Sequence, residues 1–251
     1  MDSLSVVLMV TDEEERIEAC LKSVSWADEI IVVDGGSRDR TLEIAGKYTT
    51  RIYRRPLDNF MNQKNFGIEL AGSDWILSVD ADEVLDIKLQ RAICEILKSG
   101  SECNGFCLTR VNIIFGKQFR FGGVQKEKIV RLFKRNKGKF EQPIHEKVCV
   151  EGRVGELKGN LLHASTPSLR HYLKKLSQYT EFEAQWMYKK NVRPRWYHFL
   201  VIPKLKFLQT YVLRLGFLDG FEGFEYHLLS AFYYFLKYAR LRELYAEKKK
   251  T

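Results

Sequence analysis

The stretch "WILSVDADEVL", residues 75–85, begins as an apolar, strand-like run and then places Asp80, Asp82 and Glu83 within four residues. Carboxylates this close repel one another, and removing them from water costs free energy unless a cation or hydrogen bonds compensate. One interpretation is a strand end followed by a solvated turn. The other is a metal site, because Mg²⁺ or Mn²⁺ is typically held by one or two carboxylates together with substrate phosphates.

Strand-like and helix-like patterns alternate around this stretch. Strands are predicted at 4–10, 29–34, 51–55 and 74–80, and helices at 12–24, 59–72 and 86–100; within 35–48 a Gly turn precedes a further helix, with Ser37 or Asp39 as its N-cap. The alternation is typical of an α/β fold, with a mostly parallel sheet flanked by helices. Ligands of such sheets bind beyond the carboxyl ends of the strands. We therefore expect Asp12, Asp34 and Asp80 to meet at one edge.

The residue pattern changes in the remainder of the chain. Residues 104–150 contain strand-like runs between Gly and Lys/Arg turns, which predict an antiparallel or mixed extension of the sheet, and residues 168–190 are helical in pattern. Proline-containing residues 193–203 are the best candidate boundary. We expect a catalytic domain at 1–190 and a basic, aromatic helical extension at 191–251.

The charge is unevenly distributed along the 251 residues, which are 45% hydrophobic and carry a net charge of +9. Residues 1–100 contain 12 Lys and Arg against 19 Asp and Glu, whereas residues 186–251 contain 13 against 5, together with 17 of the 32 aromatic residues. A basic, aromatic C-terminal region indicates an anionic partner, either a membrane surface or a nucleic acid.

The N-terminus and the cysteines suggest a compartment. Met1 is followed by an acidic, strand-like start without a basic leader, and no apolar run approaches the roughly 18 residues needed to span a bilayer. The five cysteines are odd in number and irregularly spaced, which argues against a zinc site. We expect a reduced, cytoplasmic chain.

Three strings carry a resemblance to a known family. They are "DEEERIEACLKSV" (12–24), "EIIVVDGGSRDRT" (29–41) and "QKNFGIELAGSDWILSVDADE" (63–83). In order and spacing they resemble the family 2 glycosyltransferases, inverting enzymes of the GT-A fold, over residues 4–85. The resemblance implies a GT-A, Rossmann-like sheet, a nucleotide-diphosphate sugar donor such as a UDP-sugar, and Mn²⁺ or Mg²⁺ as cofactor.

The same resemblance implies roles for individual residues. Asp34 would hydrogen-bond the base or ribose, Asp80 would lie on the ribose side, and Lys64 would contact a phosphate. Asp12 and Glu14, after the first strand, would also lie against the nucleotide. The family usually has Asn where this chain has Asp12, so that contact differs here.

The metal and the catalytic base complete the implied site. Asp82 would hold the metal, and His163 is a candidate further ligand because many GT-A enzymes supply a late histidine; a core histidine is the alternative. Inversion requires a base to deprotonate the acceptor hydroxyl. Glu146 is favoured and His145 comes second, in "FEQPIHEKV" (140–148), although both could simply form a turn and an ion pair.

The C-terminal region indicates the acceptor. Residues 213–243 resemble lipopolysaccharide-core glycosyltransferases of the inner-core heptose β-1,4-glucosyltransferase type, through the G-F-L-D-G-x-x-G string of residues 216–223. That type usually has an aromatic residue where Val124 follows Gly122 and Gly123. The implied acceptor is a lipopolysaccharide-core or other lipid-linked glycan.

A helical stripe in the same region predicts peripheral contact with the inner face of the cytoplasmic membrane. Basic amphipathic helices rich in aromatic residues lie in membrane interfaces. Packing of the stripe on the catalytic domain is the alternative. The stripe consists of Leu228, Leu229, Phe232, Phe235, Leu236 and Ala239, flanked by Lys237, Arg240 and Arg242.

Other functions remain as alternatives. A polyprenyl-phosphate glycosyltransferase, or one acting on a protein or another acceptor, would use the same donor site. A nucleotide-sugar binder without turnover would not need the complete acid set. A nucleic-acid-binding protein would have no use for Asp80 and Asp82, so we expect no nucleic-acid partner.

Overall fold

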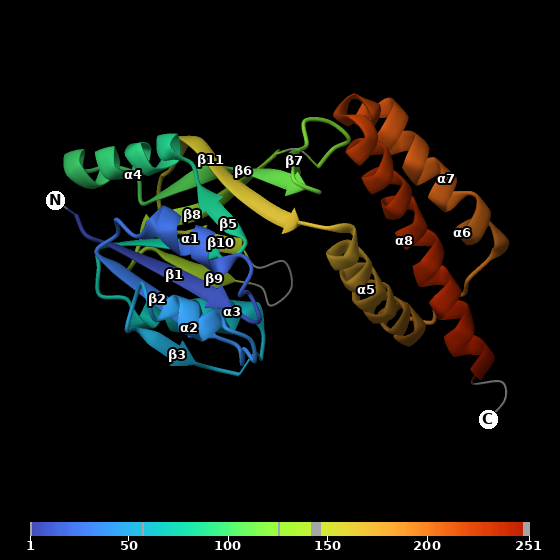
Figure 1. Ribbon diagram of the computed structural model, residues 1–251, viewed down its shortest axis with the longest axis horizontal. Coiled ribbons are helices and arrows are strands. Elements are labelled where there is room, and N and C mark those ends of the chain that lie inside the picture. Colours follow the sequence, from blue (N-terminus) through green and yellow to red (C-terminus); the bar gives the residue numbers. More distant parts are fainter. Residues whose placement is uncertain (1, 57, 125, 142–146, 248–251) are drawn as a thin grey trace. The chain divides into compact units, whose positions relative to one another are not determined.

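The computed structural model describes residues 2–56, 58–124, 126–141 and 147–247 (Figure 1). By its internal contacts the chain divides into unit 1, residues 1–111 with 127–163, and unit 2, residues 112–126 with 164–251. Strands β6 (Gly105–Ile114) and β11 (Val154–Thr166) run from one unit into the other. The predicted domain boundary at residue 190 stays a prediction.

The sheet of unit 1 begins with four parallel strands. Their order is β3 (Ile52–Arg54), β2 (Glu29–Asp34), β1 (Leu4–Val10) and β4 (Trp75–Asp80). The register pairs Val10 with Asp34 and Met9 with Asp80. The last residues of β2 and β4 therefore reach the same edge of the sheet, as the sequence predicted.

Beyond β4 the sheet turns antiparallel. Strand β8 (Lys126–Lys134) pairs antiparallel with β4, and the order continues through β6 and β11 to β5 (Glu83–Leu85), which is antiparallel to β11. A separate hairpin is formed by β9 (Gly138–Glu141) and β10 (Lys147–Val150). The α/β class is confirmed, and the extension is of the kind expected for residues 104–150.

Helices cover both faces of the parallel strands. Alternate residues of β1 enter different cores: Val6 packs in the cluster that contains Ile17 of α1, and Val7 in the one that contains Ile68 of α3. The helices are α1 (Ile17–Val24), α2 (Thr41–Ala45), α3 (Phe60–Leu70) and α4 (Ile87–Ser99). The side chains of Asn59 and Asp86 cap α3 and α4 by accepting a backbone N–H each.

Unit 2 is helical apart from a hairpin. It contains the hairpin strand β7 (Lys117–Gln118) and the helices α5 (Leu169–Lys189), α6 (Trp196–Leu200), α7 (Ile202–Phe207), η1 (Leu208–Leu213), η2 (Gly216–Asp219) and α8 (Gly220–Glu247). The long helix α8 packs against α5, α6 and α7. Within the described ranges, none of the helices combines the length and apolarity needed to cross a bilayer.

The G-F-L-D-G-x-x-G string, residues 216–223, holds neighbouring segments of unit 2 together. Asp219 is 2% exposed, and its carboxylate accepts the backbone N–H groups of Arg120 and Phe121, both at 3.0 Å. A Cβ at Gly223 would lie 2.4 Å from the Gly216 carbonyl oxygen, so a side chain would prevent the approach of these two segments. We name the Asp219–Arg120–Phe121 arrangement the Asp219 clamp. It joins the β7 loop to the start of α8.

Candidate active site

The acidic turn after β4 is closed by its own third carboxylate. Asp80 is the last residue of β4, Asp82 lies in the turn, and Glu83 opens β5. The Glu83 side chain is fully buried and accepts the backbone N–H of Asp80 at 3.0 Å. Glu83 therefore supports the loop, and Asp80 and Asp82 are left as the more accessible carboxylates, at 29% and 14% exposed.

Two buried cations from distant elements hold Asp80. Lys64 Nζ of α3 lies 3.2 Å from Asp80 Oδ1, and Arg131 Nη2 of β8 lies 2.6 Å from Asp80 Oδ2 and 3.2 Å from Glu83 Oε1. Burial would raise the pKa of Asp80, but Arg131 and Lys64 more than offset it and hold that pKa below its ordinary value. Burial raises the pKa of Glu83, with Arg131 opposing it.

Asp82 has a different set of neighbours. Its Oδ2 lies 3.4 Å from Nε2 of His163 and 3.5 Å from Nη1 of Arg16. The pairing of β11 with β5 places His163 opposite Glu83, which explains how a residue 81 positions away reaches the turn. Burial would raise the pKa of Asp82, but the contact with His163 outweighs it and the pKa is lowered.

The Asp82–His163 pair fits a site completed by substrate. Among the residues that the structure describes, no group of three or more His, Cys, Asp or Glu could hold a metal. The pair itself offers one carboxylate oxygen and one imidazole nitrogen within reach of a common ion. Mg²⁺ and its analogues often take few protein ligands and complete their coordination with phosphates and water. A divalent cation bound together with a diphosphate suits this donor set.

Asp34 ends β2 with one carboxylate oxygen satisfied. Oδ1 accepts the backbone N–H of Ser37 at 2.9 Å, whereas Oδ2 has no hydrogen-bond partner within the described part of the chain. The nearest cation is Arg54, whose Nε lies 3.8 Å away and whose side chain is 77% exposed. Asp34 can therefore accept one further hydrogen bond if the Arg54 side chain moves aside.

Asp12 and Glu14 surround the loop that follows Asp34. Oδ1 of Asp12 accepts the backbone N–H of Arg38 at 2.8 Å, and Oε2 of Glu14 accepts that of Arg40 at 3.0 Å. Asp12 also has a positive φ of 53°. These carboxylates shape the loop of residues 37–40, and their predicted contact with a nucleotide stays a prediction.

A cavity of about 460 Å³ opens beside Asp80, and Asp34 is not among the residues that line it. The predicted bases His145 and Glu146 lie outside the described residues, between Phe140 and Lys147, which both line this cavity. The lining consists of Lys64, Asp80, Cys107, Arg110, Glu127, Lys128, Ile129, Val130, Arg131, Phe140, Lys147 and Val148.

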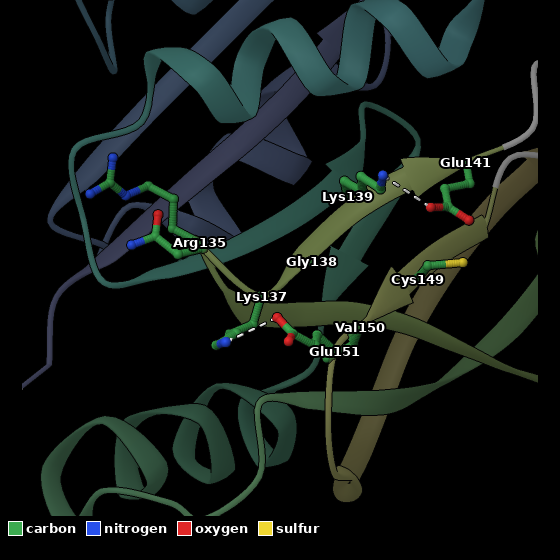
Figure 2. Close-up of a pocket in the computed structure, with 9 residues that line it drawn as sticks. Arg135, Lys137, Gly138, Lys139, Glu141, Cys149, Val150 and Glu151 are labelled. Carbon is green, nitrogen blue, oxygen red and sulfur yellow. Dashed lines mark hydrogen bonds and ion pairs between the residues drawn. The ribbon is translucent and has the colours of Figure 1, made fainter.

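A second cavity, next to the β9–β10 hairpin, contains none of the predicted site residues (Figure 2). Lys137 pairs with Glu151 at 2.9 Å and Lys139 with Glu141 at 3.2 Å, as the dashed lines in Figure 2 mark. Because Asp80 and Lys64 line the first cavity and no predicted site residue lines this one, the cavity beside Asp80 is the better candidate for substrate.

Sequence reasoning missed several of the charges that build the site. Arg131 is not among the predicted site residues, although an arginine inside the apolar run "IVRLF" (129–133) is itself a signal of a buried ion pair. Arg16 and Arg110 gave no such signal. Arg110 lies 3.5 Å from Glu83 and 2.5 Å from Glu127.

Comparisons with known proteins show which family the chain resembles. The sequence model of the family described as "Glycosyl transferase family 2" matches residues 5–151. The lipopolysaccharide core biosynthesis glycosyltransferase LpsC of Rhizobium meliloti is 29% identical, over 98% of this chain and 94% of its own. An uncharacterized glycosyltransferase of Rickettsia typhi is 28% identical, over 97% and 88%.

Two solved structures have weaker likeness. TarS of S. aureus is 15% identical, over 98% of this chain and 92% of its own, with a TM-score of 0.43. Glucosyl-3-phosphoglycerate synthase of Mycobacterium tuberculosis, in complex with Mg²⁺ and UDP, is 16% identical, over 70% and 74%, also with a TM-score of 0.43. The strand order and the family match, which spans more than half of the chain, confirm the predicted fold class.

Proposed function

The chain belongs to glycosyl transferase family 2 and is a glycosyltransferase, and from this premise we propose that it moves a sugar, with inversion, from a nucleotide-diphosphate sugar to a lipopolysaccharide-core or other lipid-linked glycan. A UDP-sugar is the first donor to test. The observation that carries the proposal is that the two aspartates of the turn after β4 have different partners. Asp80 is held by two cations, and Asp82 faces His163. Similarity to LpsC along 98% of the chain supports the acceptor.

The donor would bind at the shared edge of β2 and β4. Asp34 would use its second oxygen to accept a hydrogen bond from the base or ribose, with Arg54 moving aside into solvent. Asp80 would face the ribose, and Asp12 and Glu14 would hold the loop beside it. Lys64, which is 3% exposed at its side chain, brings a positive charge toward the diphosphate.

Asp82 and His163 would hold Mn²⁺ or Mg²⁺. Such a cation, when bound, would neutralise the negative charge that develops on the leaving nucleoside diphosphate. The lowered pKa of Asp82 keeps its carboxylate ionised at neutral pH and ready for a cation. Arg131 adds a fixed positive charge on the other side of Asp80, in a largely buried position where charge interactions are strong.

The acceptor would enter the cavity beside Asp80. Glu146 would remove the proton from its attacking hydroxyl, with His145 as the alternative base. A polyprenyl-phosphate acceptor is the second candidate, because its phosphate is already an anion and needs no base; replacing Glu146 with Gln would then leave turnover largely intact. A protein or another acceptor would still require the base.

We also propose peripheral contact with an anionic membrane, at its cytoplasmic face. Three members of the predicted α8 stripe, Leu228, Phe232 and Phe235, are exposed. Residues 1–190 would then carry the catalysis and residues 191–251 the membrane contact, as the charge distribution suggests.

A donor screen tests the proposed reaction. Wild type, Asp82→Ala and Asp82→Asn would be incubated with nucleotide sugars and Mn²⁺ or Mg²⁺, and release of the nucleoside diphosphate would be measured with and without EDTA. Glu95→Gln, an exposed carboxylate on α4, is the matched control. We expect metal-dependent release by wild type and Glu95→Gln only. Full activity of Asp82→Ala, or no binding of any nucleotide sugar, would overturn the proposal.

A further inference from the structure

One long segment of the chain contains no acidic residue. Residues 184–218 hold seven Lys and Arg and no Asp or Glu, in a chain in which charged residues make up 29%. The segment runs from the end of α5 through α6, α7, η1 and most of η2. All of it lies in unit 2.

The same segment exposes many large apolar side chains. Leu213 is 73% exposed and Trp196 is 69% exposed, which are values expected of polar residues. Contiguous apolar surface of this kind marks a site of interaction with a membrane or another macromolecule. The exposed residues are Trp186, Trp196, Tyr197, Leu200, Val201, Leu205, Leu208, Val212, Leu213, Leu215, Phe217 and Leu218.

The apolar side of α8 continues this surface. Phe221, Leu228, Phe232 and other exposed residues recur at helical spacing along α8. Ring contacts join the two parts: Phe199 with Phe235 at 6.0 Å and Phe207 with Phe224 at 6.1 Å. Figure 1 shows α6 and α7 running alongside α8. Exposed apolar side chains of all three helices therefore lie on elements that pack against one another.

We propose that the surface formed by residues 196–218 with Leu228, Phe232 and Phe235 of α8, named here the basic aromatic face, lies on an anionic lipid bilayer. The inference rests on the proposed membrane contact and specifies which surface makes it. Trp, Tyr and Leu would enter the boundary between headgroups and acyl chains, and exposed Lys204 and Arg195 would meet lipid phosphates. The absence of acids from residues 184–218 removes the repulsion that an anionic surface would otherwise exert.

A contrast within unit 2 favours lipid over a generic apolar contact. Phe182 of α5 is as exposed as Leu213, at 71%, but it stands between Glu181 and Glu183. An anionic bilayer would repel the surroundings of Phe182 and attract those of Leu213. Exposed apolar side chains of similar size therefore differ in the charge around them, which provides a matched control.

Sedimentation with vesicles tests the surface. The full chain would be mixed with vesicles of three parts phosphatidylcholine to one part phosphatidylglycerol, and with phosphatidylcholine alone. We expect salt-sensitive binding to the anionic vesicles only. The double variant Leu205→Ser/Leu213→Ser should bind about tenfold more weakly or worse, whereas Phe182→Ser should bind like wild type.

The charge is tested separately. Lys204→Gln should weaken binding about fivefold, since one cation near an anionic surface contributes about 1 kcal/mol, and Lys98→Gln on α4 is its control. Circular dichroism and donor hydrolysis in solution would verify that each variant is folded.

The outcomes separate the two proposals. If the wild-type protein does not bind anionic vesicles, both the proposed membrane contact and the proposed surface are overturned. The donor screen still decides the enzymatic proposal. Binding that survives Leu205→Ser/Leu213→Ser, or that falls with Phe182→Ser instead, overturns the basic aromatic face alone. Equal binding to both vesicle types shows that lipid charge is not recognised, and it also overturns the inference.

Discussion

Two aspartate-centred turns, one in each unit, use the same side chain in opposite ways. In unit 1, Asp80 and Asp82 are partly exposed and are held by side chains from distant elements, namely Lys64, Arg131 and His163. In unit 2, Asp219 is buried and accepts two backbone N–H groups. A carboxylate with side-chain partners and solvent access can exchange those partners for a ligand. A buried carboxylate that accepts two backbone amides is held in place and serves the fold.

The largest expected effect is on activity at the first turn. Asp82→Asn should lower kcat about 10²–10³-fold, because it weakens the site for the cation that would stabilise the leaving group. The midpoint of thermal unfolding should change little, since Asp82 is not needed to close the turn. Steady-state kinetics and a melting curve measure the two quantities. A variant that loses stability but keeps its kcat would reverse the comparison between the two turns.

The second effect is on stability at the Asp219 clamp. Asp219→Ala leaves the N–H groups of Arg120 and Phe121 without their acceptor, and because these hydrogen bonds are only partly buried each loss costs about 0.5–1.5 kcal/mol, so the free energy of unfolding should fall by roughly 1–3 kcal/mol. Asp219→Asn retains one acceptor oxygen and should lose about half as much. Urea unfolding measures both variants. Equal losses would mean that the charge, and not the hydrogen bonds, holds the clamp.

The third effect concerns the glycine beside the clamp. Gly122 has a φ of +75°, and a Cβ there would lie 2.2 Å from Nε2 of the buried His227. Gly122→Ala should cost about 1–3 kcal/mol, through the strained φ and the overlap together. Gly116→Ala is the control, since Gly116 has nearly the same φ, +76°, and open space around its Cβ position. If both variants lose the same stability, the overlap with His227 contributes nothing.

The acidic edge was predictable because it follows from local patterns and one rule of topology. Asp34 and Asp80 end apolar runs, and parallel strands bring their carboxyl ends together. The helix starts were less predictable. Helix α1 begins at Ile17 rather than at residue 12, and the backbone N–H of Glu13 is satisfied by Thr41 Oγ1, 28 residues away. Such non-local hydrogen bonds leave no local signal.

The partners of the site's carboxylates were hidden for the same reason. Arg131 reaches Asp80 across 51 residues of sequence, and only the pairing of β8 with β4 brings them together. In α5, helical spacing puts Leu173, Tyr179 and Phe182 on one side together with Leu176, but the three are exposed. The helix buries Leu176, Thr180, Ala184 and Met187 instead. Ala184 and Met187 pack with Leu241 of α8, a partner that apolar spacing alone does not reveal.

The smallest expected effect is a pH dependence confined to unit 2. Burial lowers the pKa of His227, with Asp219 opposing and Lys206 adding to the shift, and neither ring nitrogen has a hydrogen-bond partner within the described residues. The unfolded chain, with an ordinary histidine pKa of about 6.5, therefore binds more protons than the folded chain below that pH. The free energy of unfolding should fall as the pH drops from about 6.5 through the lowered folded pKa.

The variant His227→Leu removes the imidazole that titrates and is the variant to compare with wild type. Melting temperatures measured at about pH 7.5 and about pH 5.5 should fall further on acidification for wild type than for His227→Leu, because only wild type must keep a neutral imidazole buried. Glu95→Gln, which alters an exposed carboxylate in unit 1, should follow wild type. If His227→Leu loses as much as wild type, the acid sensitivity belongs to the paired carboxylates of unit 1. In that case the turn of Asp80 and Asp82 in unit 1 would make stability depend on pH, and the buried groups around Asp219 in unit 2 would not.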